Sequence, residues 1–172
     1  MSNEPRAEVR ITALKADEID ELSRLATEIW RAHYPAIISD AQIEYMLAQR
    51  YAPAVLRSEL AQGGVWWDAL RVEGRMAGFA SYFLTRITDE LKLDKVYVYP
   101  CDQRQGYGGM LIDRAVTIAR AYGRDVLTLA VNKRNRHAIA AYRKHGFAIV
   151  ESVVKDIGGG FVMDDYVMTR HV

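Results

Sequence analysis

The sequence predicts a mixed α/β protein folded as one domain over residues 1–172. Apolar residues recur with the spacing of a helix in some segments and alternate with the spacing of a strand in others. The chain is long enough for one sizeable core and short for two domains. No internal repeat, low-complexity tract or linker divides it, so the segments are expected to share one core.

Residues up to 64 predict one strand followed by helical segments. The expected elements are a strand over 9–14, helices over 16–34 and 40–51, and one or two helical turns over 53–64. In the first helix the apolar positions share one face: Ile19, Leu22, Leu25, Ala26, Ile29 and Trp30. Pro35 breaks this helix, because proline has no N–H to donate. Ser39 or Asp40 can cap the next one.

From residue 65 the spacing changes to that of strands. The expected order is strands over 65–72, 75–86 and 90–100, a helix over 110–123, a strand over 125–131, a helix over 135–146 and a closing hairpin over 147–172. Glu73 and Gly74 supply the turn between the first two strands. Alternation in the third strand predicts one face with Leu91, Leu93, Lys95 and Tyr97 and another with Lys92, Asp94, Val96 and Val98.

Composition and charge narrow the classes of function. The 23 Lys and Arg residues against 22 Asp and Glu give a net charge of +1, which disfavours nucleic acid or an anionic membrane as a partner. No apolar run approaches the roughly 20 residues of a membrane-spanning helix, and the start MSNEPRAEVR lacks the order of a signal peptide. The single cysteine, Cys101, fits a reducing cytoplasm, where we expect the protein. The histidines lack metal-ligand spacing, so no metal is expected.

The segment QRQGYGGM, residues 103–110, concentrates three glycines just before a helix. Glycine destabilises a helix by about 1 kcal/mol relative to alanine, so the glycines need another reason. A helix start exposes unpaired N–H groups and the positive end of the helix dipole, which together bind anions. Gly106 and Gly108 let a phosphate approach the backbone. The pattern G-x-x-x-x-G-K-[ST] is absent and G-x-G-x-x-G fails at Leu111, which leaves a plain glycine-rich turn as the alternative.

Three separated motifs together resemble the GCN5-related N-acetyltransferase (GNAT) superfamily. Residues 103–108, QRQGYG, are similar to its Q/R-x-x-G-x-G/A pyrophosphate motif, and KVYVYP, residues 95–100, looks like its fourth strand. Residues 135–147 match the spacing N-x-x-A-x-x-x-Y-x-x-x-G-F. The resemblance implies a GNAT fold, with a mixed, mostly antiparallel twisted sheet of about six to seven strands flanked by about four helices. It also implies acetyl-CoA as co-substrate.

The resemblance also assigns residues to the coenzyme. It implies that the backbone of Val96, Tyr97 and Val98 pairs with the pantetheine arm, and that the N–H of Val96 bonds the thioester carbonyl, where charge builds up during attack. The pyrophosphate is expected at Gln103, Arg104, Gln105, Gly106, Tyr107, Gly108 and Gly109. Asn135 can cap the next helix, contact the coenzyme, or both.

Tyr142 is, by the same resemblance, the general acid that protonates the departing thiolate. Its helical spacing also suits a core tyrosine.

The base is less clear, because many relatives have a glutamate on the strand before Asn135, and Ala130 stands at the corresponding position here. Glu90 and Asp94 flank the coenzyme strand and, by alternation, share the face of Val96, so either can act directly or through water.

The acceptor is expected between the first helices and the closing hairpin. Trp30, His33 and Tyr34 cluster at the helix break and can frame a small amine, and Asp164 or Asp165 can attract its charge. We therefore predict direct acetyl transfer to a primary amine of a polyamine- or amino-acid-like small molecule. The alternatives are a protein N-terminus or lysine as acceptor, or a regulatory module that binds acyl-CoA without turnover. A homodimer is common in the family and is compatible with the sequence.

Overall fold

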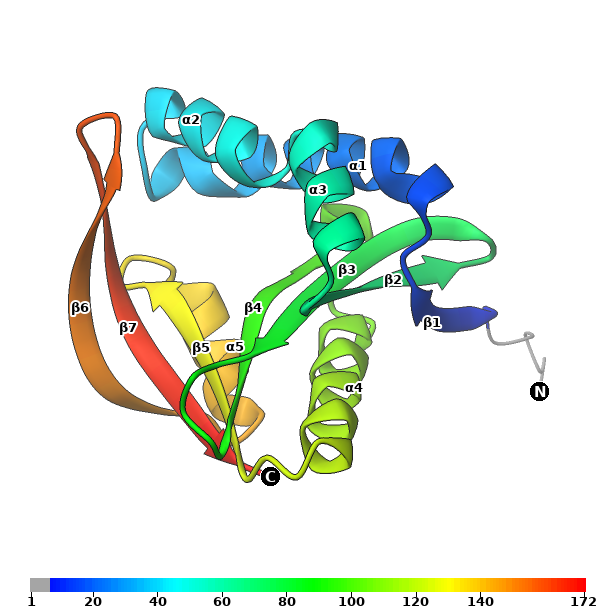
Figure 1. Cartoon of the computed structure of the whole chain (residues 1–172). Coiled ribbons are helices and arrows are strands. Elements are labelled where there is room, and N and C mark those ends of the chain that lie inside the picture. The colour runs from blue at the N-terminus through cyan, green and yellow to red at the C-terminus, as the bar shows by residue number, and fades with distance from the viewer. Residues whose placement is uncertain (1–6) are drawn as a thin grey trace, which may run out of the picture.

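One seven-stranded sheet runs through residues 7–172, the part of the chain that the computed structural model describes (Figure 1). The strands are β1 (Val9–Ala13), β2 (Val65–Val72), β3 (Arg75–Leu84), β4 (Glu90–Val98), β5 (Val126–Asn132), β6 (Ala148–Gly158) and β7 (Phe161–His171). Their order in the sheet is β1-β2-β3-β4-β5-β7-β6. Neighbours are antiparallel except β4 and β5, which are parallel. The predicted mixed, mostly antiparallel sheet is confirmed; residues 1–6 of the predicted domain lie outside the described part.

Helices cover both faces of this sheet (Figure 1). The helices are α1 (Ile19–His33), α2 (Asp40–Arg50), α3 (Pro53–Gln62), α4 (Tyr107–Ala121) and α5 (Arg136–Lys144), with 3₁₀ turns η1 (Ala16–Glu18), η2 (Tyr34–Ala36) and η3 (Pro100–Asp102). The described residues thus hold five α-helices, one more than expected, because the segment after Pro53 continues as a full helix. None of these helices is both long and apolar enough to span a membrane.

Two apolar clusters fill the space between the sheet and its helical layers. Helices α4 and α5 pack on one face through Leu111, Ile112, Ala115, Ala119 and Ile139, over Leu91, Leu93, Leu127 and Leu129. Helices α1, α2 and α3 pack on the other through Ile19, Leu22, Ile29, Trp30, Ile43, Met46 and Leu56, over Trp67, Ala69 and Phe79. The apolar helical face predicted over 16–34 is the buried face of α1.

The predicted helix break at Pro35 and the caps at Ser39 and Asn135 are confirmed, whereas the helix predicted over 110–123 begins at Tyr107, so Gly108 and Gly109 lie in its first turn and not before it. Pro35 lies in the 3₁₀ turn η2 that separates α1 from α2. The Oγ of Ser39, not the carboxylate of Asp40, accepts the N–H of Gln42 at 3.2 Å at the start of α2. The Oδ1 of Asn135 accepts the N–H of Ala138 at 3.3 Å at the start of α5.

The predicted alternation along β4 is wrong at Asp94. The β3–β4 register shifts at this point and leaves Asp94 without a partner in the ladder, as a bulge. The extra residue reverses the direction of every later side chain. Val96 therefore packs on the α4 side with Leu93, whereas Lys95 and Tyr97 face the layer of α1 to α3.

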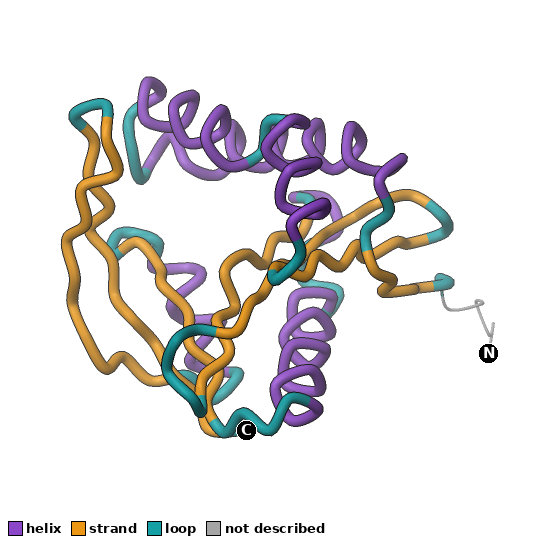
Figure 2. The backbone as a smooth tube through the Cα atoms, in the orientation of Figure 1, coloured by secondary structure: helices purple, strands orange, loops and turns teal. Residues whose placement is uncertain are grey.

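The parallel strands β4 and β5 pair over a short stretch only, Glu90–Lys92 with Val126–Thr128. Beyond it each strand stays paired on its other side, β4 with β3 and β5 with β7. The two strands diverge, as the backbone trace shows (Figure 2). Their facing edges are therefore not used by the sheet in this region.

The close approach of β3 and β4 next to this divergence depends on Gly78. A Cβ at Gly78 would lie 2.7 Å from the carbonyl oxygen of Tyr97. We expect Gly78→Ala to lower the free energy of unfolding by roughly 1–3 kcal/mol, because the backbone of β4 must move. Urea denaturation measures this. A matched Gly108→Ala variant, whose Cβ meets Val98 at 4.0 Å, should keep or gain stability, and equal losses in both variants would contradict the prediction.

Candidate active site

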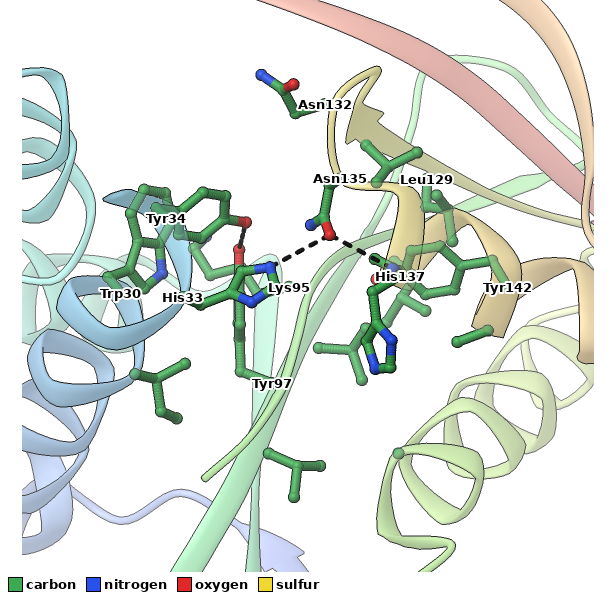
Figure 3. Close-up of a pocket in the computed structure, with 18 of the residues that line it drawn as sticks. Trp30, His33, Tyr34, Lys95, Tyr97, Leu129, Asn132, Asn135, His137 and Tyr142 are labelled. Atoms are coloured by element: carbon green, nitrogen blue, oxygen red, sulfur yellow. Dashed lines mark hydrogen bonds between the residues drawn. The ribbon is translucent and has the colours of Figure 1, made fainter. Parts of the chain in front are cut away.

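A cavity of about 390 Å³ opens where β4 and β5 diverge. Its walls come from α1 and α2 on one side, α4 and α5 on the other, and β4, β5 and β7 between them. Figure 3 shows Trp30, His33 and Tyr34 reaching it from the first helices and Tyr142 and His137 from α5. Nearly all residues that the sequence assigned to the coenzyme, the acceptor or the proton transfers line this one cavity; the exceptions are Gln105, Asp164 and Glu90.

The edge of β4 that faces the cavity carries free backbone groups. The N–H of Tyr99 donates to the carbonyl oxygen of Ala77 at 2.8 Å, which fixes the phase of the β3–β4 ladder. Since hydrogen-bonded and non-bonded pairs alternate in such a ladder, Val96 and Val98 direct their N–H and C=O groups away from β3. The carbonyl oxygen of Val98 accepts the Nε2 of Gln103 at 3.1 Å. The N–H of Val96 thus stays available to a ligand.

The glycine segment forms the start of α4 at one end of the cavity. Gly106 has φ 86°, a left-handed conformation that favours glycine, and its carbonyl oxygen accepts the N–H of Met110 at 3.1 Å. The preceding N–H groups of the first turn have no partner within the helix. A Cβ at Gly108 would meet only Val98, at 4.0 Å, so this glycine keeps space in the cavity. A Cβ at Gly109 would lie 2.8 Å from Cε1 of His145, so this glycine permits close packing of α4 on α5.

Tyr142 both packs in the core and lines the cavity. Its ring lies 5.8 Å from that of Phe147, centroid to centroid, in an edge contact. Burial raises the pKa of Tyr142 above its ordinary value of 10.0. The phenol therefore holds its proton at neutral pH where it lines the cavity.

His33 is held at the cavity by the cap of α5. Its Nε2 lies 3.2 Å from Oδ1 of Asn135, an oxygen that already accepts the N–H of Ala138 (Figure 3). Because this oxygen is an acceptor, Nε2 of His33 is the donor, and neutral His33 carries a free lone pair on Nδ1. Burial lowers the pKa of His33 from its ordinary 6.5, although the hydrogen bond to Asn135 opposes the shift. His33 is therefore largely neutral at pH 7.

The two carboxylates that the sequence offered as bases are poorly placed. The bulge removes Glu90 and Asp94 from the face of Val96, because the side chains change direction there. Asp94 lines the cavity and forms a salt bridge with the buried Lys95. Burial, the largest single influence, would raise the pKa of Asp94, but the charges of Lys95, Arg50 and Lys92 and the hydrogen bond from Lys95 together lower it, which makes Asp94 a weaker base. Ala130 supplies an uncharged wall.

Aromatic rings form the wall on the α1 side. Trp30 is buried, with 2% of its surface exposed, and its ring lies 4.3 Å from that of Tyr34. The hydroxyls of Tyr34 and Tyr97 are hydrogen-bonded at 2.8 Å. The predicted cluster at the helix break thus exists, and Tyr97 of β4 extends it.

Charged groups in the cavity include some that sequence reasoning missed. Arg50, the last residue of α2, lines the cavity. Its position in the last turn of a helix gave no sign of this, because a cation there commonly only stabilises the helix dipole. Asp165 lines the cavity and is 4% exposed, whereas the neighbouring Asp164 pairs with Lys133 at the surface. The strand period predicted that one of these two aspartates faces the site, but not which one.

Across residues 7–172, no group of three or more His, Cys, Asp or Glu side chains is arranged to hold a metal ion. Cys101 is exposed and lies 3.9 Å from a carboxylate oxygen of Asp102, without a base beside it. The side chains that line the cavity include tyrosines, histidines and a few charged groups.

Solved structures that share this fold include proteins named as N-acetyltransferases. PaiA N-acetyltransferase from Thermoplasma acidophilum, solved in complex with coenzyme A, superposes with a TM-score of 0.81 and 21% sequence identity, over 96% of this chain and 99% of that one. A GCN5-related N-acetyltransferase from Rhodopseudomonas palustris gives a TM-score of 0.80 and 19% identity, over 99% and 100% of the two chains.

Sequence comparison leads to the same family. The chain is 24% identical over 160 residues to spermidine N(1)-acetyltransferase of Thermoplasma acidophilum, covering 91% of this chain and 96% of the relative. Streptothricin acetyltransferase of Streptomyces lavendulae is 35% identical over 80 residues, covering 46% of this chain and 42% of the relative. The profile of the acetyltransferase (GNAT) family matches residues 19–147. The divergence of β4 and β5 and the glycine-rich start of α4 beside it agree with these matches. The match of the family profile shows that the chain belongs to the acetyltransferase (GNAT) family.

Proposed function

We propose that this protein transfers the acetyl group of acetyl-CoA to a primary amine of a small molecule, by direct attack while both substrates are bound. The observation that carries the proposal is the juxtaposition of the free β4 edge, the start of α4, Tyr142 and His33 around one cavity. The relative named for spermidine acetylation supports a small amine as acceptor.

The chain fits coenzyme A at two places. The first-turn N–H groups of α4 and the side chain of Arg104 lie where a diphosphate can accept hydrogen bonds, and Gly108 keeps the space for it. The free edge at Val96 and Val98 can bind the amide groups of the pantetheine arm as an added strand would. The N–H of Val96 would then donate to the thioester oxygen, where one preorganised donor can contribute about 3 kcal/mol.

Protons move at two residues in the proposed reaction. An acceptor that binds as an ammonium first releases one proton to solvent, because only the neutral amine has the lone pair that attacks. The amine nitrogen then bonds to the acetyl carbon and the carbon–sulfur bond breaks, so the nitrogen loses a further proton and the sulfur gains one. His33 accepts the proton lost during attack at Nδ1, directly or through a water molecule, and Tyr142 donates the proton that the sulfur gains. Solvent then restores both residues.

Three further predictions are kept from the sequence. Asn135 can contact the coenzyme while it caps α5. The single cysteine is compatible with a cytoplasmic location. The exposed Val150 and Val154 on the edge strand β6 are compatible with a homodimer. The regulatory alternative, binding without turnover, is tested by thiol release from acetyl-CoA across a panel of amines.

We expect Gly108→Leu to weaken coenzyme A binding by at least about tenfold, because its side chain fills the space beside the first turn of α4. Isothermal titration calorimetry measures the Kd. The matched variant Ala121→Leu, at the exposed far end of the same helix, should bind normally. Equal affinity of both variants would remove the diphosphate assignment.

We expect Tyr142→Phe to lower kcat about 10²-fold with a smaller change in KM, because the variant keeps the ring and removes only the acid. Steady-state kinetics with acetyl-CoA and an accepted amine measures both constants. Tyr122→Phe, at an exposed tyrosine, is the control. An unchanged kcat in Tyr142→Phe would exclude the acid role.

The pH profile of kcat tests His33. Since the pKa of His33 is lowered and only the neutral form accepts a proton, kcat should be constant near pH 7 and fall as the pH drops through a pKa below 6.5. His33→Gln should reduce kcat about 10²-fold and abolish this acidic limb. His171→Gln, exposed on β7, should keep the profile of the native protein. An acidic limb that persists in His33→Gln would assign the proton to another group.

A further inference from the structure

Two opposite charges inside the cavity lack protein partners. Asp165 is 4% exposed and lines the cavity, and its Oδ1 has no hydrogen-bond partner among residues 7–172. Arg50 lines the same cavity, and none of the ion pairs found in that part of the chain includes it. A carboxylate oxygen without a donor is unfavourable in such a buried place.

The other charged side chains near Asp165 and Arg50 either form ion pairs or do not line the cavity. Lys95 is paired with Asp94, and its ammonium also lies 4.9 Å from the ring centroid of Trp67. Lys133 is paired with Asp164. Lys92 influences Asp165 by its charge but does not line the cavity. One anion and one cation therefore remain for a ligand, Asp165 and Arg50.

Each of these two groups selects a partner of opposite charge. Burial raises the pKa of Asp165, and the nearby positive charge of Arg50 opposes that rise. An ammonium group would add both a donor for Oδ1 and a charge that favours the ionised carboxylate. The guanidinium of Arg50 presents a planar set of donors that suits a carboxylate.

We propose that the acceptor is an amino carboxylate, whose amino group is drawn in by Asp165 and whose carboxylate is bound by Arg50. This inference rests on the proposed function and narrows it to one class of amine. A polyamine brings two or more positive charges and no anion, so it leaves Arg50 facing a like charge. The balanced charge of the cavity disfavours such an acceptor.

The test compares acceptors that differ in charge alone. Acetyl transfer from acetyl-CoA is measured with amino carboxylates of increasing separation between the two groups, from glycine to 6-aminohexanoate and lysine, with the methyl ester of each, and with putrescine and spermidine. In the native protein at least one amino carboxylate should exceed its own ester by about tenfold or more in kcat/KM. The comparison requires no mutation, so it does not depend on the folding of a variant.

Two variants assign the effect to the residues. Arg50→Gln should remove the preference for the acid over its ester, mainly through KM, and Asp165→Asn should raise KM for acid and ester alike. Arg57→Gln and Asp164→Asn are matched controls, since both native residues form exposed ion pairs away from the cavity. Both controls should keep the preference of the native protein.

The inference is overturned if putrescine or spermidine exceeds every amino carboxylate, or if Arg50→Gln leaves the ratio of acid to ester unchanged. Either result leaves acetyl transfer to an amine intact. Coenzyme A binding without acetylation of any amine in the panel instead rejects the proposed function, and this inference with it.

Discussion

The site depends on one constraint of the sheet, the short parallel pairing of β4 and β5. Both strands are held firmly on their outer sides, β4 by β3 and β5 by β7, so they cannot close on each other after they part. In a continuous sheet the backbone N–H and C=O groups on this edge of β4 would be hydrogen-bonded to the next strand. Here they remain free next to a cavity. An unpaired edge is usually a liability in a sheet. Here two helical layers enclose it, which leaves an extended ligand as its natural partner.

The groups around this edge are positioned by elements far apart in sequence. Asn135 joins two of them, because its Oδ1 caps α5 and also accepts from His33 at the end of α1. The cap fixes the amide, and the fixed amide in turn selects which nitrogen of His33 carries the proton. The same contact thus stabilises a helix and fixes the proton on Nε2 of His33. Tyr142, seven residues further along, faces the cavity from the same helix.

Electrostatics divides the charged residues of the cavity into two kinds. Asp94 and Lys95 neutralise each other where burial would otherwise oppose both charges. Asp165 and Arg50 lack such a partner among the ion pairs of residues 7–172, so in the proposal above they are the charges that recognise the acceptor. The pairing of Asp94 with Lys95 depends on the bulge at Asp94, which directs Lys95 toward the layer of α1 to α3.

The sequence by itself determined the order of the elements and the family, because both are local signals. Helical spacing around Ile19, the proline at 35 and the glycines at the start of α4 act within one or two turns of chain, and the structure has helices at these places, although α4 begins at Tyr107 and not at 110. Only the tertiary structure decided which aspartate faces the cavity, where alternation in β4 breaks, and that Arg50 lines the same cavity as His33. A bulge, a strand that ends its pairing early and a charge left unpaired all result from contacts between distant segments, and no local pattern encodes them.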